Sequence, residues 1–404
     1  MRLSTNTIYE QSLTSITVQQ ELLLKTSQQL STGKRILTPA DDPIAAAQVL
    51  NISQSDSINT QFAQNRNNAQ SALALSESVL GSVSNLIQSV RDTAVYAGNG
   101  TLTASERTML AGSVRGQLEE LIGQANTTDS SGRYLFSGYQ GSTKPFSQTS
   151  SGVQYSGDQG QRMVQVSASR QITLSNSGSD IFESIKSGNG VFVTAADGGN
   201  TGSGVIDIGS VTDPTQLNKN SKSYQVKFSD SSHYDVVDPV TGDPIDSINQ
   251  NNSYVSGNAI SFDGIQFNIT GSPAAGDTFT VNPSANQSLF KTIDDLITTL
   301  IAPVDTPADN AKLANGVSAA LQSLDNSLNH ILINRSSIGS RQQEVDTLQS
   351  IGSDLSLQYK QSISQLQDVD YAQAISDLNQ QQVYLQAAQK TFEKVSGLSL
   401  FNFM

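Results

Sequence analysis

Two histidines are the side chains of this sequence best suited to hold a transition metal. His233 and His330 lie in different regions of the chain. A two-histidine site would also need carboxylates at matched spacing. His330 falls between the apolar positions Leu328 and Ile331, which favours a place at the edge of a helix bundle. We therefore expect no metal site.

Four aspartates, Asp235, Asp238, Asp243 and Asp246, could bind Ca²⁺ through their carboxylates. They flank two turns that contain proline. Their spacing is not the alternating-oxygen pattern of a calcium loop, whereas Asp before Pro or Gly is typical of turns. We interpret them as turn residues.

Asp41 and Asp42 are a carboxylate pair of the kind used in general acid–base catalysis, but such chemistry needs a pocket that shifts their pKa values. Here they lie between Pro39 and Pro43. Asp42 before Pro43 is typical of an N-cap followed by a first-turn proline. We predict an elbow between domains that contacts a neighbouring subunit, with Lys34 or Arg35 as the pairing cation. Its residues are Gly33, Lys34, Arg35, Pro39, Asp41, Asp42 and Pro43.

No other pattern indicates an enzyme or a cofactor. The glycine-rich stretches at 33–35 and 199–204 are too short for a phosphate-binding loop. The sequence has no G-x-S-x-G motif and no cysteine. We expect no catalytic residue, no metal and no cofactor.

Heptad patterns at the two ends of the chain are the strongest structural signal. Apolar residues recur every seven positions near each terminus, and Ala374 and Ala388 take interleaved positions in the second stripe. A stripe of this width packs against another helix. The ends are thus predicted to pair with each other or with neighbouring copies, and both alternatives stay open. The predicted assembly interface is Tyr9, Ile16, Leu23, Leu30, Tyr371, Leu378, Leu385, Phe392 and Val395.

Local signals predict where the elements begin and end. A first helix should run from Thr5 to Thr32, with Gly33 as a left-handed C-cap. The next should start at Pro43 and end before Gly98-Asn99-Gly100, and Thr103 with Glu106 predicts a capping box. Period-two patterns at 163–166 and 224–228 predict strands, and Asp263-Gly264 predicts a type I′ hairpin. Helix should return near Asn286 and again after Pro307. Gly339, one turn after Arg335, predicts close packing between helices.

Composition narrows the class of protein. The chain has 404 residues, a net charge of −13, no Cys and no Trp. An acidic surface disfavours nucleic acid as a partner. No apolar run is long enough to span a membrane. Residues 1–30 lack the layout of a cleavable signal peptide, because Glu10, Gln19, Gln20 and Glu21 interrupt it.

Three segments resemble the flagellin superfamily of bacterial flagellar axial proteins. They are QLSTGKRILTPADDPIAA (29–46), NRSSIGSRQQEVDTL (334–348) and the C-terminal YLQAAQKTFEKVSGLSLFNFM. Within the superfamily, GRYLFSGYQGSTKPF (132–146) is similar to the hook-associated protein 3 branch. The resemblance implies an extracellular flagellar component at the hook–filament junction, exported by the flagellar type III system. It also implies hook-associated protein 1, flagellin, further copies in a ring and an export chaperone as partners.

The sequence predicts an elongated α+β protein with discontinuous helical domains. Residues 1–42 should pair with 365–404, and 43–140 with 286–364. Residues 141–285 should form a β-rich insert, divided in two if the seam at 197–204 is a boundary. Few contacts should cross the insert's ends at 138–141 and 282–286, so we expect it to be removable. The predicted function is mechanical adaptation between two helical assemblies. The alternatives are a flagellin of unusual sequence and an enzyme within 141–285, where no catalytic cluster is evident.

Overall fold

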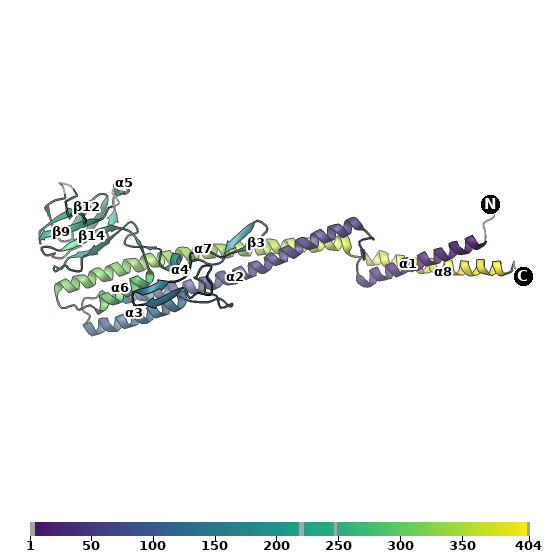
Figure 1. Ribbon diagram of the computed structural model, residues 1–404, viewed down its shortest axis with the longest axis horizontal. Helices are drawn as coiled ribbons and strands as arrows, with labels where there is room; N and C mark the ends of the chain where they lie inside the picture. Colours follow the sequence, from purple (N-terminus) through teal and green to yellow (C-terminus); the bar gives the residue numbers. More distant parts are fainter. Residues whose placement is uncertain (1–4, 218–221, 246–248, 402–404) are drawn as a thin grey trace. The chain divides into compact units, whose positions relative to one another are not determined.

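The computed structural model describes residues 5–217, 222–245 and 249–401 (Figure 1). Two compact units share these residues. One consists of Met1–Arg66 and Thr347–Met404, and the other of Asn67–Asp346. Long helices and a β-rich middle confirm the α+β class. The three-part division expected from the sequence stays a prediction.

The first unit contains a pair of terminal helices, α1 (Thr5–Thr32) and α8 (Tyr371–Phe401). They lie side by side and antiparallel (Figure 1). Gly33 has a φ of +71°, which confirms the left-handed C-cap. After the elbow, α2 (Pro43–Ala97) begins at Pro43, and the Ala45 amide donates to Asp42 Oδ1 at 3.0 Å. The predicted N-cap is confirmed.

The second unit contains a helical part made of four helices. They are the later part of α2, α3 (Ala104–Ala125), α6 (Leu289–Ile301) and the earlier part of α7 (Pro307–Gln367). The capping box of Thr103 and Glu106 is present at the start of α3. Two ion pairs join α2 to α7: Arg335 with Glu77 at 2.6 Å and Arg91 with Asp325 at 2.6 Å.

Short elements after α3 pack onto these helices. They are β1 (Phe146–Thr149), β2 (Gly152–Tyr155), β3 (Met163–Ser167), β4 (Arg170–Thr173) and α4 (Gly178–Phe182). Phe146 and Phe182 are fully buried, with their ring centroids 5.4 Å apart. The ring centroid of Phe290 in α6 lies 4.8 Å from that of Phe146. Residues 146–182 were expected in the insert, but their aromatic side chains complete the core of the helical part.

A neck of two short strands leads to the remaining β structure. β5 (Ile185–Lys186) pairs with β15 (Asn286–Gln287), and the Ser187 amide donates to the Ala285 carbonyl at 3.0 Å. On α7, Asn326 donates to the carbonyls of Lys186 and Gly188. The chain therefore leaves and re-enters the helical part at one place.

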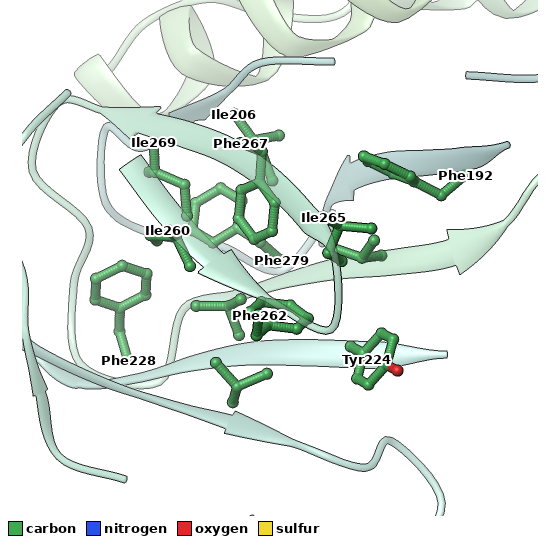
Figure 2. Packing of buried hydrophobic residues seen from close by; sticks show 13 residues of the cluster. Phe192, Ile206, Tyr224, Phe228, Ile260, Phe262, Ile265, Phe267, Ile269 and Phe279 are labelled. Carbon is green, nitrogen blue, oxygen red and sulfur yellow. The ribbon is translucent and has the colours of Figure 1, made fainter. Parts of the chain in front are cut away.

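Beyond the neck, two sheets share one core (Figure 2). The first has the order β11-β10-β9-β14-β6 and the second β12-β13-β7, with β8 beside β13. Their strands are β6 (Phe192–Ala196), β7 (Val205–Ile206), β8 (Ser210–Val211), β9 (Tyr224–Asp230), β10 (His233–Val237), β11 (Asn252–Ser253), β12 (Ala259–Phe262), β13 (Ile265–Thr270) and β14 (Thr278–Pro283), with the short α5 (Pro214–Leu217) after β8. The core joins Phe192, before the glycine-rich seam at 197–204, to Phe267 and Phe279 after it. Asp263 (φ +46°) and Gly264 (φ +79°) confirm the type I′ hairpin.

Candidate assembly interface and elbow

The predicted interface residues mostly face one another across the α1–α8 pair. The rings of Tyr9 and Phe392 lie 5.1 Å apart, and Ala374 is buried. The remaining stripe positions are half-buried, as expected for a seam between only two helices. They are Ile16, Leu23 and Leu30 on α1 and Leu378, Leu385 and Phe392 on α8. Val395 lies outside the described side chains.

Tyr371 lies at the elbow end of the pair. Its side chain is 54% exposed, and its hydroxyl oxygen would be 3.0 Å from a Cβ at position 33. Gly33 is thus constrained twice, by its positive φ and by the approach of this hydroxyl.

A second set of apolar side chains on the pair is exposed. Val383 is 62% exposed and lies about 200° around α8 from Leu385. The heptad pattern missed this set because its members do not follow the seven-residue repeat. Counting the large apolar residues of the two terminal helices that lie outside the stripe could have revealed this set. They are Ile8, Leu13, Val18, Leu22 and Leu24 on α1 and Ile375, Val383 and Tyr384 on α8.

At the elbow, the linker after α1 pairs with the linker before α8. Lys34 and Asp368 form an isolated antiparallel bridge. The Arg35 amide donates to the Gln367 carbonyl at 2.7 Å, and the Val369 amide donates to the Gly33 carbonyl at 2.9 Å. Main-chain hydrogen bonds therefore fix the two linkers to each other, which sequence reasoning did not predict.

The two elbow carboxylates have structural partners. Asp41 Oδ1 lies 2.6 Å from Lys25 Nζ, and its Oδ2 accepts hydrogen bonds from the amides of Leu37 and Thr38. Lys25, and then these amides, hold the pKa of Asp41 well below its usual range. Asp42, the N-cap of α2, lies 3.4 Å from Arg35 Nη2. Within the chain Arg35 lies beside Asp42, and Lys25 is a partner of Asp41 that sequence reasoning missed. The contact of the elbow with a neighbouring subunit stays a prediction.

The remaining candidates for chemistry have local partners. His330 Nε2 lies 2.8 Å from the Asp180 carbonyl oxygen, and His233 Nδ1 lies 3.1 Å from Asp230. Asp238 accepts a hydrogen bond from the Val240 amide within its own turn. Among the residues that the structure describes, no group of three or more His, Asp or Glu is placed to hold a metal ion. Within the same residues, no helix is long and apolar enough to cross a membrane.

Two cavities accompany the helices. One of about 310 Å³ lies between α2 and α7 in the first unit, beside Asn59 and Lys360. Another of about 410 Å³ in the second unit lies between β6 and α7, beside Asp207 and Lys312. The lining of the first cavity also includes Arg66 and Ser356, and that of the second includes Asp295 and Ser323.

Three family models match the chain. The bacterial flagellin N-terminal helical region matches residues 3–141, and the C-terminal helical region matches 321–404. A flagellar hook-associated protein 1 D2-like domain matches 195–283, which lies within the two-sheet domain.

The chain is similar to two flagellar proteins over almost its full length and to a flagellin over about a third of it. It is 31% identical to flagellar hook-associated protein 3 of Salmonella typhimurium and 32% identical to that of Escherichia coli, each over 402 residues and 99% of both chains. Polar flagellin F of Vibrio parahaemolyticus is 33% identical over 132 residues, or 32% of this chain and 34% of that one.

Solved structures of proteins called FlgL match the fold of this chain. The crystal structure of Xanthomonas campestris FlgL (space group C2) matches with a TM-score of 0.72 and 28% identity, over 78% of this chain and 99% of that one. The flagellar junction protein FlgL from Legionella pneumophila matches with a TM-score of 0.70 and 30% identity, over 80% and 100%.

Proposed function

Because the chain belongs to the flagellar hook-associated protein 3 family, we propose that it joins the hook to the flagellin filament as a ring of copies. It is a structural component of the bacterial flagellum. The observation that carries the proposal is the full-length match, which includes both helical ends and the two-sheet domain. The flagellin relative matches only 132 residues, which disfavours a filament subunit.

The terminal pair is the inner layer of the ring in this proposal. Residues 1–42 with 365–404 form that layer, 43–140 with 286–364 and the short elements at 146–182 form the next, and the two-sheet domain faces outward. Its neighbours are hook-associated protein 1 on the hook side and flagellin on the filament side. Export by the type III system with a chaperone, and a location outside the cell, belong to the same proposal. The family is structural, and we propose no reaction and no cofactor.

The two apolar sets of the terminal pair have different roles. The heptad set closes the seam within one chain, as the contact of Tyr9 with Phe392 supports. The exposed set is left for neighbouring subunits. Burying one Leu or Ile side chain fully is worth about 1.5–3 kcal/mol. The eight side chains of the exposed set are 37–62% exposed in the single chain, so covering them gains about half of that value each and offsets part of the entropy lost on assembly.

Immunogold labelling of intact flagella tests the location. A single band at the hook boundary is the expected result. Label along the whole filament would identify a filament subunit instead and overturn the proposal.

Three substitutions in α8 test the roles of the two sets. Leu385→Asp should open the seam, because Leu385 is half-buried between the two helices, and a carboxylate there loses the apolar contact and is partly withdrawn from water. Val383→Asp should leave the seam closed and still prevent attachment. In both cases cells should secrete flagellin and carry bare hooks. Gln386→Asp, at an exposed polar position, should be nearly silent. Normal filaments on Val383→Asp cells would show that the exposed set faces no neighbour.

A further inference from the structure

One asparagine of α7 binds the edge of the two-sheet domain through both ends of its side-chain amide. The Ile206 amide donates to Asn315 Oδ1 at 2.9 Å, and Asn315 Nδ2 donates to the Gly204 carbonyl at 3.1 Å. The other edge of β7 pairs with β13, where Ile269 lies opposite Ile206. An amide side chain carries one acceptor and two donors, so Asn315 takes the place that a further strand would have beside β7.

A second asparagine of α7 holds the neck. Asn326 Nδ2 donates to the Lys186 carbonyl at 2.9 Å and to the Gly188 carbonyl at 2.6 Å. Asn315 and Asn326 are about three helical turns apart, which places them on the same side of α7 and roughly 16 Å from each other along its axis. A domain attached at one point can turn about that point, whereas attachment at two points fixes its direction.

The space between these two attachment points is hollow. The cavity of about 410 Å³ extends from Gly188 and Gln287 at the neck to Asn315, and its wall includes Asp207 of the two-sheet domain and Lys312 of α7. The apolar core of the two-sheet domain lies within the domain itself (Figure 2). Side chains that border an unfilled space lack packing partners across it. Close packing therefore contributes little to the orientation of the domain at this place, and the hydrogen bonds of Asn315 contribute more.

We propose that Asn315 sets the orientation of the two-sheet domain on the helical part, with the neck as the pivot. While its amide binds Gly204 and Ile206, the domain is fixed at two points. When these two hydrogen bonds are absent, the domain turns about β5 and β15, and the cavity supplies the room for this movement. The orientation determines which face of the domain a neighbouring copy would meet in the proposed ring, but the inference concerns the single chain and does not depend on the ring.

The expected effect follows from the two hydrogen bonds. Asn315→Ala removes both of them, and the net contribution of two hydrogen bonds shifts an equilibrium by roughly five- to 150-fold. Asn315→Asp keeps an acceptor for the Ile206 amide but places a second acceptor beside the Gly204 carbonyl, so it should release the domain as well. The fraction of chains with the domain turned away should thus rise about fivefold or more in both variants.

Double electron–electron resonance on the full chain measures the orientation. The chain has no cysteine, so spin labels attach only to introduced ones. Met109→Cys on α3 and Val240→Cys in the turn after β10 replace side chains that are 65% and 91% exposed. With Asn315 present, the distance between the labels should give one narrow peak. In Asn315→Ala the population outside that peak should rise at least about fivefold. An unchanged distribution, or one that is already as broad with Asn315 present, would overturn the proposal.

Two controls separate the orientation of the domain from the folding of the helices. Asn310→Ala removes an exposed asparagine near the start of the same helix and should leave the distribution unchanged. Labels at Met109→Cys and Ile333→Cys, both exposed and both on the helical part, should give the same narrow peak with and without Asn315. Broadening of this second pair in Asn315→Ala would show that the substitution loosens the helices, and would refute a specific role in orienting the domain.

Discussion

Replacing residues 145–283 with a Gly/Ser linker should unfold the helical part of the second unit, whereas a shorter replacement should leave it folded. The longer cut removes Phe146 and Phe182, both fully buried against Phe290 of α6. The shorter cut replaces residues 188–284 with Asn-Gly. It retains both aromatic rings and closes β5 and β15 as a two-residue hairpin, for which Asn-Gly is the preferred sequence. The 3.0 Å hydrogen bond between Ser187 and Ala285 shows that the ends already meet.

The expected loss follows from the aromatic cluster. Removing one buried Phe side chain costs about 3–5 kcal/mol. Two of them cost about 6–10 kcal/mol, although rings in contact do not add strictly. The total free energy of unfolding of a domain is about 5–15 kcal/mol. The longer cut therefore removes most or all of it. The shorter cut removes a core of its own, formed within residues 192–281, and costs the helices few contacts.

Thermal unfolding followed by far-ultraviolet circular dichroism measures the difference. The shorter variant should melt cooperatively near the temperature of the intact helices, and the longer variant should show no cooperative helical transition. Phe146→Ala alone should lower the free energy of unfolding by about 3–5 kcal/mol, and Val240→Ala, at an exposed position, by less than about 0.5 kcal/mol. If both cuts melt alike, the aromatic cluster does not hold the helices together.

Three further predictions concern single positions. Gly339→Ala should raise the free energy of unfolding by about 0.5–1 kcal/mol in a urea titration, because a Cβ there meets no atom within 4 Å. Gly352→Ala should lower it, because its Cβ would collide with the buried guanidinium of Arg66; equal shifts would contradict this. The pKa of Asp41 is lowered from 3.8, so its contribution to stability is complete above pH 3.8 and is lost as the pH falls through the folded-state pKa. An NMR titration should place its midpoint below 3.8, and Lys25→Met should move it upward, whereas an unchanged midpoint would exclude Lys25 as the main cause.

Local chemistry made much of the fold predictable. The caps at Gly33, Asp42 and Thr103 and the turn at Asp263-Gly264 are confirmed because each depends on hydrogen bonds or φ angles within a few residues. Helix and strand positions follow from periodicity for the same reason.

Contacts between residues that are far apart in the sequence could not be predicted. Phe146 looked like the start of an insert, since nothing nearby shows that it meets a helix about 140 residues later. The close-packing interpretation of Gly339 was wrong, because that position faces open space. The ion pair of Lys25 with Asp41 was not predicted. It forms because the chain turns back at the elbow, which the residue spacing does not show.

The exposed apolar residues of α1 indicate how many neighbours this helix contacts, which the heptad stripe alone does not. A stripe marks one straight contact with one partner helix, and α8 of the same chain is that partner. On α1, Leu13 lies about 60° from Ile16 and Leu24 about 100° from Leu23 to one side of the seam, whereas Leu22 lies about 100° from Leu23 and Val18 about 160° from Ile16 to the other. A helix that met one further neighbour would need only one of these sides. Apolar side chains on both flanks fit a subunit with a copy on each side, as a closed ring requires.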